Sequence, residues 1–230
     1  MQPYVDLIDE IIRCGHDRPD RTGVGSRFIW GTQIHFDLSE GFPATTVRPV
    51  PLRWAFEETM FFLRGLTQTK YLESKGVTIW KGNTTREFLD NRGLTDLPDG
   101  DMGKGYGYQW RNFGGTERVV DENLDTVEYG REGVDQFNEM IGAMTDNPDS
   151  RRHIVTAWNP LQLNETALPP CHLLQHYNII NGQLNSLFWM RSNDVIYGLP
   201  FNIAQYAFIN LFIAKLFNLE PGTLVYPVSY

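Results

Sequence analysis

The stretch from Leu168 to Asn202 limits the fold of this 230-residue chain more than any other. Two largely apolar runs within it meet at Asn181-Gly182. That dipeptide suits a tight hairpin turn because both central residues of the turn must take positive φ. The sequence therefore predicts two antiparallel strands on either side of residues 181–182.

Cys171 stands at the head of this predicted hairpin, directly behind Pro169 and Pro170. Successive prolines fix φ and remove backbone donors, so a stiff segment carries the thiol. A lone cysteine is more often a small buried hydrophobe than a nucleophile, but a thiolate requires a positive neighbour. Arg191 could be that neighbour and could bind an anionic substrate through its guanidinium fork. The alternative for Arg191 is a solvated strand end, and spacing alone leaves both interpretations open.

Length and composition limit the class of protein. A chain of 230 residues with 41% hydrophobic content suits one domain, residues 1–230, with a substantial core. No apolar run reaches membrane-spanning length and no signal-peptide pattern is apparent, so we expect a cytoplasmic protein with no membrane partner. Two cysteines make no disulfide framework, which fits a reducing compartment. A net charge of −8 argues against a nucleic-acid partner, so anionic ligands would need local arginine clusters.

Hydrophobic periodicity predicts a mixture of helices and strands. Helical spacing occurs in residues 2–14, from about residue 51 through Leu52, Phe56, Met60 and Leu63, and in residues 134–144. Residues 203–217 are apolar on most faces, which predicts a buried helix. Strands are expected at 26–38 and 153–158, a loop at 93–105 and a polar surface insertion at 115–133. The sequence shows neither metal-ligand spacing nor a Gly-x-Gly-x-x-Gly motif.

Several separated motifs make the chain resemble the thymidylate synthase family over nearly its whole length. In order, they are Asp20-Arg21-Thr22-Gly23-Val24-Gly25, Gly41-Phe42-Pro43-Ala44, Val77-Thr78-Ile79-Trp80, Tyr106-Gly107-Tyr108-Gln109-Trp110-Arg111, Asp149-Ser150-Arg151-Arg152, Pro170-Cys171-His172, Arg191-Ser192-Asn193-Asp194 and Pro200-Phe201-Asn202. So many matches in the same order make chance a poor explanation. The resemblance implies an α+β fold whose mixed, twisted sheet packs at a homodimer interface, with helices on its other face.

The same resemblance implies a one-carbon transferase that acts at C5 of dUMP through a covalent Cys171 adduct. The co-substrate would be 5,10-methylenetetrahydrofolate, with neither metal nor flavin. The implied site residues are Glu58, Tyr106 and Asp194 for catalysis beside Cys171; Arg21, His172, Arg191, Ser192 and Asn202 for the substrate; Arg151 and Arg152 for the phosphate in the other subunit's site; and Trp80, Asn83 and Asp194 for folate.

Residue type alone allows an ordinary role for each of these side chains. The alternatives are a solvated helix edge for Glu58, a core indole for Trp80, a mobile surface loop for Arg21 and a solvated pair for Arg151 and Arg152. Asn202 carries more chemical information, because its amide can donate to O4 and accept from N3–H of uracil. An aspartate would suit cytosine better, so we expect dUMP to be the nucleotide.

The product of the reaction is harder to predict. Where the family usually has Gly-Pro-Val-Tyr, Gly-Asp-Thr-Asn and Gln-Arg-Ser, this chain has Gly103-Lys104-Gly105-Tyr106, Gly65-Leu66-Thr67-Gln68 and Met190-Arg191-Ser192. The last of these is more similar to phage pyrimidine hydroxymethylases, in which water attacks the methylene. The sequence also ends at Tyr230, before the family's ribose-binding segment and C-terminal tail, so either the chain is shortened or a longer natural chain is represented in part. Loss of the tail would weaken the exclusion of water.

The favoured interpretation is therefore a hydroxymethylase that makes 5-hydroxymethyl-dUMP in a bacterium or a phage-infected host. A true thymidylate synthase that makes dTMP and dihydrofolate is the alternative, and the presence of Trp80 supports it. A catalytically idle regulator that binds nucleotides or RNA on the same fold is a third possibility. The intact Cys171, Glu58, Tyr106 and Asn202 count against the regulator, because binding alone needs no nucleophile.

Overall fold

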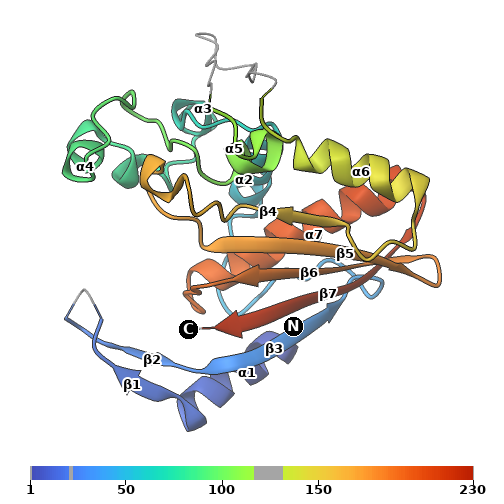
Figure 1. The fold of residues 1–230 in the computed structure, drawn as a ribbon. Coiled ribbons are helices and arrows are strands. Elements are labelled where there is room, and N and C mark those ends of the chain that lie inside the picture. Colours follow the sequence, from blue (N-terminus) through green and yellow to red (C-terminus); the bar gives the residue numbers. More distant parts are fainter. Residues whose placement is uncertain (1, 21–22, 117–131, 230) are drawn as a thin grey trace. The chain divides into compact units, whose positions relative to one another are not determined.

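The computed structural model describes residues 2–20, 23–116 and 132–229 (Figure 1). The helices are α1 (Gln2–Cys14), α2 (Leu52–Leu63), α3 (Lys70–Ser74), α4 (Arg86–Asn91), α5 (Gly107–Asn112), α6 (Gln136–Asp146) and α7 (Gly198–Leu216), with 3-10 turns η1 (Lys81–Asn83) and η2 (Leu163–Glu165). The strands are β1 (His16–Arg18), β2 (Ser26–Phe28), β3 (Trp30–Asp37), β4 (Ile154–Thr156), β5 (His172–Ile180), β6 (Gln183–Met190) and β7 (Glu220–Ser229). The mixed helix and strand content confirms the predicted α+β class.

Contacts divide the chain into two compact units. Unit 1 comprises Met1–Ala55 and Tyr177–Tyr230, and unit 2 comprises Phe56–His176. The helix α2 and the strand β5 each run from one unit into the other. The single domain expected for residues 1–230 stays a prediction.

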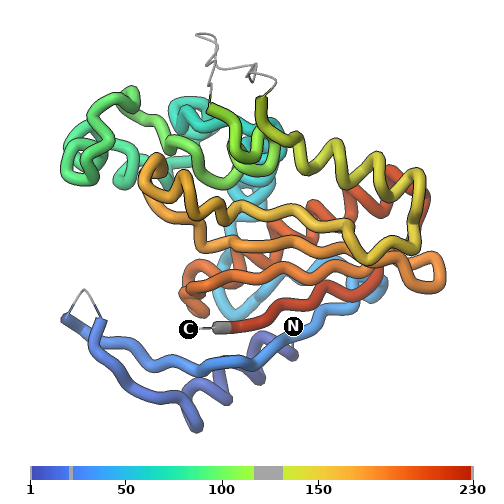
Figure 2. Tube along the Cα trace, viewed as in Figure 1, coloured from blue at the N-terminus to red at the C-terminus, as the bar shows by residue number. Residues whose placement is uncertain are grey.

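The predicted hairpin is present as β5 and β6, joined by Asn181 and Gly182. Asn181 and Gly182 have positive φ, 51° and 77°, as a tight two-residue hairpin turn requires. The sheet order is β3-β7-β6-β5-β4. Because β7 pairs antiparallel with β3 but parallel with β6, the sheet is mixed, as expected. Figure 2 shows the N-terminal strand β3 beside the C-terminal strand β7.

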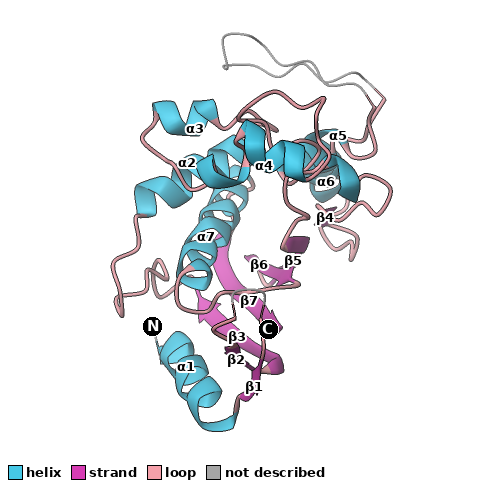
Figure 3. Cartoon of the chain, turned by 90° about the vertical axis from the view of Figure 1, so that its left-hand side faces the viewer, coloured by secondary structure: helices cyan, strands magenta, loops and turns pink. Residues whose placement is uncertain are grey.

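The core of unit 1 is organised around α7, which packs on β6 and β7 (Figure 3). Tyr206 of this helix stacks on Phe188 of β6 with ring centroids 3.5 Å apart. The sequence predicted that this helix begins at Ile203, but it begins at Gly198. The earlier start arises because the carbonyl of Asp194 accepts hydrogen bonds from the backbone N–H groups of Gly198 and Leu199. Residues 200–202 therefore belong to a helix and not to the loop before it.

The other terminal elements of unit 1 follow the sequence more closely. The helix α1 has the predicted bounds, and its Tyr4 hydroxyl donates to the carbonyl oxygen of Val195 at 2.9 Å. Not every apolar side chain of this helix is buried, since Ile12 is 62% exposed. The strand expected at 26–38 is divided into β2 and β3 at Ile29.

In unit 2, the apolar spacing along α2 identified the wrong face of the helix. Phe56 is 37% exposed, whereas Glu58 and Phe62 are only 5% and 2% exposed. Here α5 adjoins the buried face, since Tyr106, the residue before α5, stacks on Phe62. Tertiary packing on the side opposite the apolar spacing therefore decides which residues of the helix are buried.

The remaining elements of unit 2 are short. The helix α6 begins at Gln136 because the Asp135 carboxylate accepts a hydrogen bond from the backbone N–H of Asn138, and β4 is shorter than the expected strand 153–158. The helices α3, α4 and α5 were not predicted, because five or six residues are too few to show a helical period. Most of the insertion expected at 115–133, residues 117–131, lies outside the described residues. Among the helices of the described ranges, none is both long and apolar enough to cross a membrane.

Candidate active site

Cys171 lies at the junction between a stiff loop and a strand. It follows Pro169 and Pro170, and β5 begins at the next residue, His172. The Cys171 side chain is half-buried and is a free thiol. Its backbone N–H donates a hydrogen bond to the hydroxyl of Tyr106 at 3.0 Å. Unit 2 thus places the phenol of Tyr106 against the backbone of Cys171, as expected for two residues of one site.

Tyr106 is buried and has an unusual backbone conformation, with φ 36° and ψ −103°. Non-glycine residues rarely have positive φ, and such conformations persist only where the surroundings enforce them. Three neighbours do so here: the ring of Phe62 stacks at 4.9 Å, the ring of His172 meets the phenol edge-on at 5.1 Å, and Gly107 abuts the Phe62 backbone. A Cβ at Gly107 would lie 2.6 Å from the carbonyl oxygen of Phe62, so only glycine fits at this position.

His172 is neutral at physiological pH. The residue is 7% exposed, and burial lowers its pKa to about 3 by disfavouring the charged imidazolium. A neutral imidazole has one nitrogen that donates and one that accepts, so it can relay a proton but cannot supply a positive charge to Cys171.

Glu58 is a buried carboxylate in α2 and not a solvated helix edge. Its Oε1 accepts a hydrogen bond from the indole Nε1 of Trp80 at 2.5 Å. The indole meets the Tyr106 ring edge-on at 5.6 Å. A continuous series of contacts therefore runs from Glu58 through Trp80 and Tyr106 to Cys171, all within unit 2.

The other predicted residues of unit 2 lie on turns. Asn83 is half-buried in the 3-10 turn η1 that follows Trp80. Arg151 and Arg152 are exposed in the turn before β4, and within the described part of the chain neither guanidinium has an ion-pair partner. Their exposure fits the sequence alternative of a solvated pair, and it also leaves both side chains available to a second subunit.

In unit 1, the structure places Asp194 and Asn202 on either side of Gly198. A Cβ at Gly198 would lie 3.5 Å from Asp194 Cβ and 3.6 Å from Asn202 Oδ1. The Asp194 carboxylate accepts hydrogen bonds from two backbone N–H groups before α7, those of Ile196 and Tyr197. The Asn202 amide donates to Gln205 Oε1 at 3.0 Å. Asp194 therefore has a structural role in starting α7, whatever ligand it contacts.

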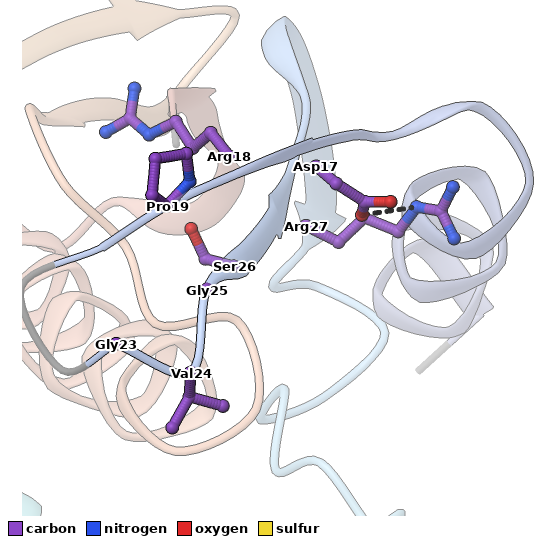
Figure 4. A pocket seen from close by; sticks show the side chains of 8 residues that line it. All are labelled: Asp17, Arg18, Pro19, Gly23, Val24, Gly25, Ser26 and Arg27. Carbon is purple, nitrogen blue, oxygen red and sulfur yellow. Dashed lines mark ion pairs between the residues drawn. The ribbon is translucent and has the colours of Figure 1, made fainter.

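Three further residues were expected at an anion site, namely Arg21, Arg191 and Ser192. Arg191 is exposed and Ser192 half-buried at the end of β6. Arg21 lies outside the described residues. The neighbouring parts of its loop line a cavity of about 560 Å³, in which Arg27 pairs with Asp17 (Figure 4). The side chain of Arg27 is therefore already engaged by a carboxylate.

Comparison with known protein families shows the family to which this chain belongs. The profile of the family described as thymidylate synthase matches residues 2–229, so the chain belongs to the thymidylate synthase family, as its motifs predicted.

Individual relatives share much of this sequence. The thymidylate synthase of Bos taurus is 42% identical over 226 residues, which are 98% of this chain and 62% of the bovine protein. That of Homo sapiens is 40% identical over 98% of this chain and 71% of its own length. The bifunctional dihydrofolate reductase-thymidylate synthase of Paramecium tetraurelia is 44% identical over 97% of this chain and 47% of its own length. The chain thus spans between about half and about seven-tenths of the length of these relatives.

Sequence reasoning missed the residues that support the site. Phe62 and Gly107 hold Tyr106 in place, and the pair Lys104 and Glu165 joins the segments that carry Tyr106 and Cys171. The one available indication was Lys104 itself, which stands where the family motif usually has proline. Within the described part of the chain, no group of three or more His, Cys, Asp or Glu residues could hold a metal ion.

Proposed function

We propose that this protein is a thymidylate synthase that transfers a methyl group to C5 of dUMP and releases dTMP. The observation that carries the proposal is the series of contacts from Glu58 through Trp80 and Tyr106 to Cys171. The bovine and human relatives are thymidylate synthases, which favours dTMP as the product over the 5-hydroxymethyl-dUMP that the motif departures suggested. An idle regulator would need neither a buried carboxylate nor a nucleophile arranged in this way.

Cys171 would act as the nucleophile. Its sulfur would add to C6 of the pyrimidine, which makes C5 nucleophilic, a form of covalent catalysis. The Tyr106 hydroxyl, which holds the Cys171 backbone, and the neutral His172 would orient the nucleotide and relay protons near C5. Glu58 would move a proton at O4 of the base, where a buried carboxylate acts free of competing water.

The nucleotide phosphate would be held by guanidinium groups. Arg21, Arg191 and the Ser192 hydroxyl would contribute from one subunit, because charge-assisted hydrogen bonds suit phosphate oxygens. Arg151 and Arg152 of the partner subunit would complete the site, which makes the active unit a homodimer. Trp189 is exposed and Leu187 half-buried on the side of β6 opposite the one that packs on α7, and this apolar side chain pair supports docking of a second copy.

Trp80 and Ile79 of unit 2 offer apolar surface that would suit a flat folate ring. Trp80 is half-buried, its N–H is engaged by Glu58, and the adjacent Ile79 is 40% exposed, so apolar surface is available for stacking. Trp80, Asn83 and Asp194 would hold 5,10-methylenetetrahydrofolate, which supplies both the one-carbon unit and the hydride when bound. No metal and no flavin forms part of the proposal.

Analysis of both products tests the proposed reaction. Wild-type protein given dUMP and 5,10-methylenetetrahydrofolate is expected to form dTMP and dihydrofolate in equal amounts, because hydride transfer oxidises tetrahydrofolate. Mass spectrometry identifies the nucleotide, and absorbance spectroscopy follows dihydrofolate. Formation of 5-hydroxymethyl-dUMP with tetrahydrofolate unoxidised would restore the hydroxymethylase interpretation. A folded protein that forms neither product nor a covalent adduct with 5-fluoro-dUMP would be a regulator.

Asn202→Asp is expected to shift the choice of base. The carboxylate can accept from N4 of cytosine but cannot donate to O4 of uracil, so the ratio of kcat/KM for dUMP to that for dCMP should fall by about a hundredfold or more. Steady-state kinetics with both nucleotides measure the ratio. Asn164→Asp, a change of the same kind at an exposed residue in unit 2, should leave the ratio unchanged. Equal ratios in wild type and Asn202→Asp would show that Asn202 does not read the base.

A further inference from the structure

Two segments of unit 2 run side by side before they reach the site. The backbone N–H of Lys104 donates to the Glu165 carbonyl at 3.0 Å, and that of Ala167 donates to the Met102 carbonyl at 2.9 Å. Between them, Gly103 comes so close that a Cβ there would lie 2.1 Å from the Glu165 carbonyl oxygen. Residues 102–104 and 165–167 therefore form a short antiparallel contact.

A side-chain ion pair reinforces this contact. Lys104 Nζ lies 2.6 Å from Glu165 Oε2, with side-chain exposures of 13% and 48%. A pair withdrawn from solvent on one side is screened less than a fully exposed pair. The backbone of Lys104 is fixed as well, because its carbonyl accepts a hydrogen bond from Gln109 Nε2 at 2.8 Å.

The two paired segments lead directly to the site. The first continues through Gly105 to Tyr106, and the second continues through Pro169 and Pro170 to Cys171. Their ends meet again where the Cys171 N–H donates to the Tyr106 hydroxyl. The two segments are thus joined at both ends, by the ion pair and two backbone hydrogen bonds at one end and by the Cys171–Tyr106 hydrogen bond at the other.

The local sequence explains why an ion pair is useful here. Lys104 lies between two glycines, which leave the backbone unusually free, whereas the proline usual at this position of the family motif would fix φ. Tyr106 follows at once with its unfavourable φ of 36°. A contact between Lys104 and a segment distant in the sequence can restrict the backbone as the proline would otherwise do.

We propose that Lys104 and Glu165 are a positioning pair that holds Tyr106 against the backbone of Cys171. Neither side chain touches the reacting atoms, so their effect is exerted through Tyr106 and Cys171. The kinetic consequence rests on the proposed function, because small displacements of a nucleophile and its neighbours lower the rate of a reaction without weakening binding.

A double-mutant cycle with kcat and KM as readouts tests the pair. Lys104→Met and Glu165→Gln are each expected to lower kcat by about tenfold and to leave KM for dUMP within about twofold. The double variant should be no slower than the slower single variant, because either change already breaks the pair. Lys104→Arg keeps the charge and should restore most of the rate. Lys70→Met, which breaks the exposed pair with Asp99 in the same unit, is the matched control and should keep wild-type kcat.

Three kinetic results would overturn the proposal: single variants within about twofold of wild-type kcat, losses that multiply in the double variant, or a change confined to KM.

If wild type makes no dTMP, the proposed function fails, and the reactivity of the Cys171 thiol then tests the pair separately. In a Cys14→Ser background, Cys171 is the only cysteine, and its rate of alkylation by iodoacetamide can be followed. We expect each single variant and the double variant to alter that rate alike, by at least about threefold. Unchanged rates would refute the pair.

Discussion

Cys171→Ala is expected to lower turnover by more than about a thousandfold, a loss of about 4 kcal/mol in transition-state stabilisation. The reason is chemical, because C5 of a uracil ring gains nucleophilicity only when a group adds at C6, and Cys171 carries the thiol whose own backbone N–H donates to Tyr106. Binding of dUMP should change little, since arginines and Asn202 would provide the binding contacts. Turnover is measured by dTMP formation and binding by isothermal titration calorimetry.

Cys14→Ala is the matched control for this experiment. Cys14 is the only other cysteine, and it is exposed at the end of α1. Its removal should leave turnover and binding at wild-type values. A Cys171→Ala variant that retained more than about a thousandth of the wild-type rate would show that Cys171 is not the nucleophile. A variant that lost dUMP binding as well would show that Cys171 mainly supports the shape of the site.

The sequence predicted those elements that depend on a few neighbouring residues, such as a turn dipeptide or a helical period. The hairpin of β5 and β6 followed from Asn181-Gly182, because the turn chemistry needs only two residues with positive φ. The bounds of α1 followed from a long helical period that ends before Gly15. The buried α7 followed from its nearly uniform hydrophobicity, although its start did not, because hydrogen bonds to the Asp194 carbonyl extend the helix toward the N-terminus.

Features that depend on distant residues could not be predicted in this way. The apolar spacing of α2 indicated a face that includes Phe56, yet burial follows the face of Glu58 and Phe62, where Tyr106 and Trp80 pack. No periodicity reports such a contact between separate segments. The family motifs supplied the identity of the site residues but not the contacts between them.

Glu58→Gln is expected to lower kcat by about a hundredfold to ten-thousandfold, the range typical of general acid–base groups. The substitution keeps the shape of the side chain, and an amide oxygen can still accept the hydrogen bond from Trp80 Nε1. The fold and the stacking surface should therefore persist, while the capacity to take up and return a proton at O4 of the base is lost. Turnover is measured by dTMP formation, and the melting temperature reports whether the fold persists.

The neighbouring residue provides the comparison that isolates this effect. Glu57 is half-buried in the same turn of α2, outside the series of contacts that joins Glu58 to Cys171. Glu57→Gln removes the same charge from the same helix and should keep kcat within about threefold of wild type, as expected away from the reacting groups. Equal losses in the two variants would mean that the negative charge of the helix, and not a proton carried by Glu58, affects the rate. A Glu58→Gln variant with nearly wild-type kcat would assign the proton transfer at O4 to another group, and Tyr106 and the neutral His172, whose rings are in contact, are the candidates.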